Sequence, residues 1–426
     1  MTTNESIPTA ELIVSLDRSD ASAAVALLCV KTGKVHEQVV STQPEELDSW
    51  WTKLKADHPG VRLLVAFEQP APNLVAFFAA RQPAAIYALN PSATWAYRRS
   101  LVVSHARTDR SDAYHQALYI FNHRAELKPW TPVPDEVEQL DRLCQGRRKL
   151  VNQRTGLTNR LQAVLKRYYP QALSLMHEDI WRCMNLAFLR RWPSPQDLLK
   201  AKLTSLKTFF HQQGSRSEAR WETRQSMIKN LIPLTPDEPI SDLLEVSVIV
   251  DQIEALNAGL SRYDQTIAER FATQNDTSMI LALPGAGPAF APRLYVAFAR
   301  FADHCNLPED FASAVGVAPV TDQSGKMRKV YRRLRCDKHT RQTFVEWAKE
   351  TIKHSVWARA YFERRKAAGH GFQSTLRALA YKWTRILWKC WKDHTLYDET
   401  QYLEKLRSKG SPLVTNTYLL TVTSNA

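Results

Sequence analysis

The N-terminal part of the chain alternates short apolar runs with amphipathic segments in an order that few folds accommodate. Three runs rich in strand-forming residues come first, separated by polar or glycine-containing turns, in ELIVSLD, AAVALLCV and GKVHEQVV. Two more follow, in VRLLVAFE and AAIYALN, and helical patterns such as PEELDSWWTKLKADH and NLVAFFAARQ lie between them. Because the segments around Trp95 and Tyr114 also look helical, the predicted order is β-β-β-α-β-α-β-α.

This order is that of an RNase H-like fold, in which the first and fourth strands each supply an acid and a late helix supplies the rest. Asp17 ends the first run and Glu68 ends the fourth, while Asp109 and Asp112 open the helical pattern after the fifth. Clustered carboxylates can hold two Mg²⁺ ions about 4 Å apart, which activate an attacking oxygen and stabilise a leaving oxygen. We therefore expect these four residues to be catalytic and to bind Mg²⁺.

Each acid also has an ordinary interpretation. In RTDRSDAYHQAL, residues 107–118, Asp109 is a good helix N-cap, and an acid at the third helical position suits the helix dipole. Taken alone, Asp17 fits a turn at a strand end and Glu68 a solvated strand end. A spacing of three nevertheless places Asp109 and Asp112 on one helical face, and the joint placement of all four acids favours a metal site.

The charge balance indicates a polyanionic partner. The 426 residues contain 57 Lys and Arg against 43 Asp and Glu, a net charge of +14, so nucleic acid is the first candidate. The longest apolar stretch, ASAAVALLCV, is far shorter than a bilayer span, and the N-terminus has no signal-peptide pattern. We expect a cytoplasmic protein without a membrane partner. Six cysteines without a CxxC pair argue against a zinc site or a disulfide framework.

Beyond Pro134 the pattern changes to long helices, and the chain length predicts two or three domains. Eight residues spaced mostly by three, four or seven form a stripe typical of a coiled coil, which suits core packing or dimerisation: Val137, Leu140, Cys144, Val151, Leu157, Leu161, Leu165 and Tyr168. Further helices are predicted at 174–192, 196–212 and 240–272. The predicted domains are an RNase H-like domain at 8–134, a helical coiled-coil linker at 135–275, a mainly helical domain at 276–398 and a C-terminal tail at 399–426.

The segment LALPGAGPAFAPRL, residues 281–294, places two glycines after a proline and before a helical pattern. It is not a P-loop, because no Gly-Lys-Ser/Thr follows. It fits a helix-hairpin-helix element in which Gly285 and Gly287 expose backbone N–H groups to a nucleic-acid phosphate. An ordinary turn between helices is the alternative.

A second candidate segment is VGVAPVTDQSGKMRKVYRRLRCDKHTR, residues 315–341, in which Ser324 and Gly325 stand in a predicted loop before a dense basic run. Arginines beside a serine can neutralise charge on a transferring phosphoryl group. A surface turn with a solvated basic face is the alternative. We expect nucleic-acid contacts from Gly325, Lys326, Arg328, Lys329, Arg332, Arg333 and Arg335. The helical pattern at 372–393 is expected to present Lys382, Arg385 and Lys389 to nucleic acid as well.

In this order, and with a helical linker between them, the motifs resemble the DEDD transposases of bacterial insertion sequences, a family described as bridge-RNA-guided recombinases. The resemblance covers most of the chain. The acids in IVSLD, VAFEQP and RTDRSDA correspond to the RuvC-like D-E-D-D residues of that family. LPGAGP and GVAPVTDQSGK, from Pro319 to the Ser324-Gly325 pair, correspond to its transposase domain. The final stretch, KLRSKGSPLVTNTYLLTVTSNA, matches nothing in the family.

The resemblance implies that Ser324 attacks a DNA phosphodiester and becomes joined to the cut strand, acting with the Mg²⁺-dependent acids in an assembly of neighbouring protomers, a dimer or a tetramer. It also implies a noncoding guide RNA that pairs with donor and target DNA and so specifies the sequence. Two alternatives remain. A RuvC-like structure-specific nuclease would use water in place of Ser324, and a DNA invertase of the same family would have nearly the same sequence.

Overall fold

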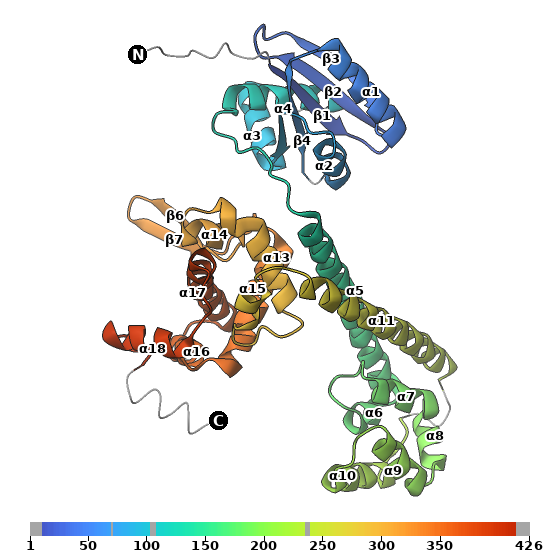
Figure 1. Ribbon diagram of the computed structural model, residues 1–426. Helices are drawn as coiled ribbons and strands as arrows, with labels where there is room; N and C mark the ends of the chain where they lie inside the picture. The colour runs from blue at the N-terminus through green and yellow to red at the C-terminus, as the bar shows by residue number, and fades with distance from the viewer. Residues whose placement is uncertain (1–10, 70, 103–107, 235–238, 415–426) are drawn as a thin grey trace. The chain divides into compact units, whose positions relative to one another are not determined.

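The computed structural model describes residues 11–69, 71–102, 108–234 and 239–414, and the chain divides into two compact units between Pro132 and Val133 (Figure 1). Four parts of the sequence predictions lie outside the described residues: the domain start at residue 8, Pro70 of the VAFEQP motif, Arg107 of the acidic motif, and residues 415–426 of the tail.

The N-terminal unit has the element order that the sequence predicts. Its elements are β1 (Glu11–Arg18), β2 (Ser22–Cys29), β3 (Val35–Ser41), α1 (Pro44–Asp57), β4 (Arg62–Glu68), α2 (Pro72–Ala79), β5 (Ala85–Leu89), α3 (Pro91–Leu101) and α4 (Asp109–His123). The strands form one sheet in the order β3-β2-β1-β4-β5. The first three run antiparallel and β1, β4 and β5 run parallel, an arrangement consistent with an RNase H-like fold.

Both faces of this sheet are buried, which explains the nearly continuous apolar runs of β1, β2 and β4. Alternate side chains of β1 serve the two faces. Leu12, Val14 and Leu16 pack with α1 and α2, whereas Ile13 packs with α4 on the opposite face. Because successive side chains of a strand point to opposite sides, Ser15 and Asp17 follow Ile13 onto the α4 face.

The C-terminal unit is mostly helical. It contains α5 (Asp135–Tyr168), α6 (Pro170–Leu175), α7 (Cys183–Arg191), α8 (Pro195–Lys200), α9 (Leu203–Gln212), α10 (Glu218–Lys229), α11 (Ile240–Ala272), α12 (Thr277–Leu281), α13 (Ala291–Phe301), the 3₁₀ helix η1 (Ala302–His304), α14 (Pro308–Ala314), β6 (Val320–Ser324), β7 (Met327–Tyr331), α15 (Lys338–His354), α16 (Val356–Ala367), α17 (Phe372–Asp393) and α18 (Glu399–Ser408).

The two long helices, α5 and α11, lie side by side and antiparallel (Figure 1). Ion pairs join Arg147 to Asp264 near one end and Arg167 to Asp242 near the other. Gly146 permits close approach, because a Cβ there would lie 2.7 Å from the hydroxyl of Tyr263. The predicted apolar stripe of α5 therefore packs within the chain, its two ends in separate cores.

The first of these cores joins the end of α5 that carries Leu161 and Leu165 to the short helices α6 to α10 and to α11. The predicted helix at 174–192 is wrong in its bounds, because the chain is not helical from Met176 to Arg182 and α7 begins only at Cys183. The side-chain amide of Asn185 forms hydrogen bonds with backbone groups of His177 and Asp179, which satisfies polar backbone groups of this non-helical connection. The helix α10 was not predicted.

The second core holds the start of α5 and the helices from α12 onward. It includes part of the predicted tail, because α18 packs on it through Tyr402, Leu403 and Leu406. Glu399 fixes the start of α18, since its carboxylate accepts hydrogen bonds from the Ser355 hydroxyl at 2.9 Å and the Val356 amide at 2.8 Å. Among the described residues, none of the helices has the length and apolar character needed to cross a membrane.

Candidate active site

The sheet brings Asp17 and Glu68 to the same edge. Asp17 is the residue before the last of β1, and Glu68 is the last of β4. Both lie on the α4 face, since Leu64 and Ala66 of β4 pack there and Glu68 follows with the same alternation. In the parallel pair of β1 and β4, Leu16 lies opposite Phe67, so the next residues along, Asp17 and Glu68, leave neighbouring strands side by side. Helix α4 packs across this face and begins with the other two acids.

The capping interpretation of Asp109 is wrong. The N-cap is Thr108, whose hydroxyl oxygen accepts a hydrogen bond from the Ser111 amide at 3.2 Å, and Asp109 is the first helical residue. Asp112 does more than compensate the helix dipole, because its carboxylate accepts a hydrogen bond from the guanidinium of Arg98 at 2.8 Å. Both side chains of this ion pair are mostly buried, 9% and 13% exposed, so each needs the other.

Besides Arg98, further polar side chains that the sequence did not single out hold Asp17 and Glu68 in place. The amide of Gln116 donates to Asp17 at 3.2 Å and accepts from the buried hydroxyl of Ser15 at 3.2 Å. The hydroxyl of Thr94 donates to Glu68. Gln116 could have been found, because it lies four residues after Asp112 and so shares its helical face. Thr94, like Arg98, stands in an ordinary helical pattern that gives no such signal.

The carboxylates also act on one another electrostatically. The pKa of Asp17 is raised from 3.8 to about 6, chiefly by burial and then by the negative charges of Asp112, Glu68 and Asp109, against a lowering hydrogen bond from Gln116. The other three predicted acids therefore all act on the carboxyl group of Asp17. Such mutual repulsion is relieved when a divalent cation binds between carboxylates.

The chemistry of the donor set fits Mg²⁺, which prefers carboxylate oxygens. A cavity of about 420 Å³ opens beside Asp17 and Glu68, whereas Asp109 and Asp112 do not line it. Within the residues that the structure describes, no three His, Cys, Asp or Glu side chains stand close enough to hold one ion. The four acids therefore lie on the α4 side of the sheet, and the charges of three of them act on Asp17. Arg98 neutralises Asp112.

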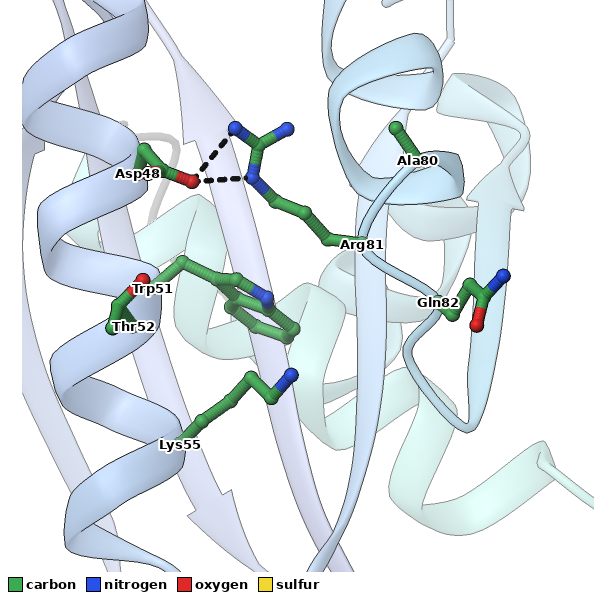
Figure 2. A pocket seen from close by; sticks show the side chains of 7 residues that line it. All are labelled: Asp48, Trp51, Thr52, Lys55, Ala80, Arg81 and Gln82. Atoms are coloured by element: carbon green, nitrogen blue, oxygen red, sulfur yellow. Dashed lines mark hydrogen bonds and ion pairs between the residues drawn. The ribbon is translucent and has the colours of Figure 1, made fainter.

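Another cavity in the N-terminal unit lies between α1 and the residues that follow α2 (Figure 2). It is lined by Trp51, Lys55 and Gln82, and by Asp48 and Arg81, which form an ion pair at 2.7 Å. With a single carboxylate that is already neutralised, this cavity lacks the donors for a divalent cation. The acidic edge of the sheet is therefore the better metal candidate.

The prediction that Ser324 stands in a loop is wrong. Ser324 is the last residue of β6, and Gly325 and Lys326 form the turn to β7. Gly325 has φ +55°, which suits a two-residue hairpin turn. Every residue of both strands is exposed, so no hydrophobic alternation marks the hairpin in the sequence.

The hairpin register sorts its side chains by face. Directly opposed residues of an antiparallel pair share a face, so Ser324 lies with its partner Met327 and, two pairs further along, with Asp322 and Lys329. The pair Gln323 and Arg328 points to the other face. Of the two predicted basic residues on β7, Lys329 therefore shares a strand face with the Ser324 hydroxyl, and Arg328 does not.

The other predicted basic residues differ in their surroundings. Lys326 is exposed at the turn, and Arg335 is exposed beyond β7. Arg333 supports the base of the hairpin, since its guanidinium donates to the Ala318 carbonyl at 3.4 Å and the Ser313 hydroxyl at 3.3 Å. Arg332 lines a separate cavity against α16 and α17.

The LPGAGP segment forms the connection between α12 and α13. Gly285 has φ +69°, and a Cβ at this position would lie 3.1 Å from side-chain atoms of both Glu350 and His354 on α15. The adjacent Pro284 carbonyl accepts a hydrogen bond from the Trp347 indole at 3.0 Å. Packing against α15 therefore accounts for Gly285, whereas a Cβ at Gly287 would meet no atom within 4 Å.

Comparisons with known families match both parts of the chain that hold candidate residues. A DEDD family model described as a transposase matches residues 14–170, which include the four acids. A second, described as the Transposase IS116/IS110/IS902 family, matches residues 277–363, which include Ser324.

Individual relatives come from bacterial mobile elements. A mini-circle protein of IS117 from Streptomyces coelicolor, which has a transposase name, is 24% identical over 330 residues, 74% of this chain and 77% of the relative. A 44.8 kDa protein of insertion element IS116 from Streptomyces clavuligerus is 23% identical over 276 residues, 64% of this chain and 68% of the relative. A 42 kDa protein of IS900 from Mycobacterium paratuberculosis is 27% identical over 157 residues, 36% of this chain and 38% of the relative.

Proposed function

Because the chain belongs to the IS110-type DEDD transposase family and is a DNA transposase, we propose that it cuts and rejoins DNA through a covalent bond between Ser324 and a DNA phosphate. The observation that favours this mechanism is the place of Ser324 at the tip of an exposed hairpin, on the same strand face as Lys329. An exposed hydroxyl is accessible to a DNA backbone, and a cation on the same strand face can neutralise the negative charge that develops on the phosphoryl group.

The proposed reaction is a phosphoryl transfer in two steps. The Ser324 oxygen loses its proton and attacks the phosphorus, a serine–phosphate bond forms, and the bond from phosphorus to the leaving DNA oxygen breaks as that oxygen takes a proton. A hydroxyl on another DNA end then attacks the serine-linked phosphate and restores Ser324. Since the number of phosphate ester bonds is conserved, rejoining needs no ATP.

The acids of the N-terminal unit are the proposed Mg²⁺ ligands: Asp17, Glu68, Asp109 and Asp112. The bound metal would polarise the reacting phosphate and lower the barrier to attack by a weak serine nucleophile. Gln116 and Thr94 orient the first two carboxylates through their hydrogen bonds. Arg98 pairs with Asp112 and so limits the negative charge of the site.

We also propose a noncoding guide RNA and a homo-oligomer as partners, in addition to donor and target DNA. The net charge of +14 supports binding to polyanions, and delegating sequence readout to base pairing suits a protein whose contacts are electrostatic. Three apolar side chains at intervals of four along α11, Ile240, Leu244 and Val248, are 80%, 65% and 46% exposed. Such a stripe suits contact with a second copy of the chain.

The test is a strand-exchange assay with donor DNA, target DNA, Mg²⁺ and the RNA encoded beside the gene. Ser324→Ala is expected to abolish both cleavage and joining while leaving the fold intact, because an exposed substitution changes stability by no more than about 0.5 kcal/mol. Thr321→Ala is the matched control, since this hydroxyl lies on the same strand and the opposite face.

Two outcomes separate the alternatives. Cleavage to free ends by the Ser324→Ala variant would contradict the recombinase mechanism and favour a RuvC-like nuclease that uses water. Joined products in which a DNA segment is inverted, with none in which it is moved, would favour an invertase of the same chemistry.

A further inference from the structure

A cavity of about 350 Å³ lies in the C-terminal unit, between the end of β7 and the helices α16 and α17. Cations and aromatic rings line it together, among them Arg332, Arg365, Arg377, Lys382, Tyr361 and Tyr381. No carboxylate is among the described residues that line it. Cavities of this size are typical of sites for small ligands.

The cations of this cavity differ from their neighbours in lacking a carboxylate partner. On α17, Arg385 pairs with Glu309 at 3.5 Å and Lys389 pairs with Asp393 at 2.5 Å. Arg377 and Lys382, on the same helix, form no ion pair with any described residue, and both line the cavity. Of the three α17 residues expected to meet nucleic acid, only Lys382 is therefore unneutralised.

These cations are also partly removed from water. Burial lowers the pKa of Lys382, and the charge of Arg385 lowers it further. Burial also lowers the pKa of Arg377, with Arg332 and Arg341 adding repulsion. The buried Nε of Arg365 has no hydrogen-bond partner among the described residues. Because a desolvated cation costs free energy unless an anion pairs with it, the lining favours an anionic occupant.

The aromatic rings indicate what kind of anion fits. The Lys382 ammonium lies 5.0 Å from the centre of the Tyr361 ring, and Tyr331 at the end of β7 is 49% exposed. Proteins that bind unpaired nucleic-acid strands combine backbone-tracking cations with aromatic faces on which bases stack. A single nucleotide matches a cavity of this size, whereas a base-paired duplex about 20 Å across cannot enter it.

We propose that this cavity receives one nucleotide of an unpaired nucleic-acid strand, its phosphate against Arg332, Arg377 and Lys382 and its base against the tyrosine rings. The proposal deepens the proposed function, because it rests on the chain acting on nucleic acid and names where an unpaired strand is bound. It does not depend on Ser324 as the nucleophile.

The test compares neighbouring arginines of one helix in the full-length protein. Arg365 lines the cavity, and Arg364 is exposed and does not. Arg365→Gln, Arg364→Gln, Arg377→Gln and Tyr331→Ala would be titrated with fluorescent single-stranded DNA, single-stranded RNA of the same sequence, and the DNA duplex. Thermal unfolding of each variant identifies any that fails to fold.

We expect Arg365→Gln, Arg377→Gln and Tyr331→Ala each to weaken binding of a single strand at least fivefold, as loss of a base or phosphate contact does. Duplex binding should change less than twofold, and Arg364→Gln should change single-strand binding less than twofold. Loss confined to the DNA or to the RNA arm identifies the strand. Equal effects of Arg364→Gln and Arg365→Gln, or equal losses for strand and duplex, would overturn the proposal.

The two proposals fail separately. Ser324→Ala protein should bind the single strands with wild-type affinity if the cavity is the strand site. If the cavity variants bind single strands as the wild type does, and the wild-type protein still forms a serine-linked product, only the proposal about the cavity is overturned.

Discussion

Asp17 shows at the scale of one residue what the acidic site costs the fold. The pKa of its carboxyl, about 6, lies above the usual 3.8, so the folded chain binds more protons than the unfolded chain between these two values. The free energy of unfolding therefore falls as the pH rises through this window. A carboxylate that destabilises the protein, and whose pKa is raised by the charges of three other acids, is typical of a functional site.

We predict that Asp17→Asn raises the free energy of unfolding at neutral pH, because it removes this charge. The gain is expected to be about 1 kcal/mol, less than the full pKa shift implies, since solvent screens a partly exposed group. The gain should vanish near pH 4, where the wild-type carboxyl is protonated as well. Denaturant unfolding across this pH range measures it, with the exposed Asp57→Asn as the control.

Addition of Mg²⁺ should stabilise the wild-type chain and not the Asp17→Asn variant, and the stabilisation should weaken below about pH 6 as protons compete with the metal. If Asp17→Asn is less stable than wild type at every pH, the carboxylate supports the fold and the account of the site is wrong.

At the scale of elements, the sequence predicts those strands and helices that an apolar pattern marks. The strands β1 and β4, which are buried on both faces, place Asp17 and Glu68 side by side. Their apolar runs could be recognised in the sequence alone. The β6–β7 hairpin could not be predicted, because all its residues are exposed and its strands carry no apolar period. The ion pair between Arg98 and Asp112 also depends on how α3 and α4 pack, which no local pattern specifies.

The hairpin register makes a prediction about two adjacent cations. Lys329→Gln and Arg328→Gln each remove one charge and should weaken DNA binding to a similar degree. At saturating DNA, however, Lys329→Gln should slow single-turnover cleavage about tenfold or more, because only this cation shares the face of Ser324. Arg328→Gln should slow it about twofold at most. Equal rates for the two variants would mean that the face of the hairpin does not matter.

At the scale of the whole molecule, charge indicates the class of partner, and burial explains the long helices. The apolar stripe of α5 was compatible with dimerisation or core packing, and most of its residues are buried within one chain, in two separate cores. The sequence could not distinguish these options, because a helical stripe records that a face is covered and not what covers it. The partner of α5 is α11, more than 70 residues later in the chain.

The net charge of +14 predicts that DNA binding weakens steeply with salt. Replacing Lys326 and Arg328 together with Gln should reduce the slope of log affinity against log salt by about two, one for each lost phosphate contact. Fluorescence anisotropy of a labelled duplex measures the slope, and the exposed pair Lys34→Gln and Lys53→Gln serves as the control. An unchanged slope would mean that the hairpin is not part of the DNA-binding surface.

The most direct measurement of the central claim is the identification of the atom that becomes joined to DNA. Wild-type protein would be incubated with Mg²⁺, RNA and a nicked substrate that traps the intermediate, then denatured and digested with trypsin. We predict a nucleotide-bearing peptide of residues 301–326, with fragmentation placing the phosphate on Ser324 and not on Ser313. Efficient cleavage without any protein–DNA adduct, or an adduct at another residue, would contradict it.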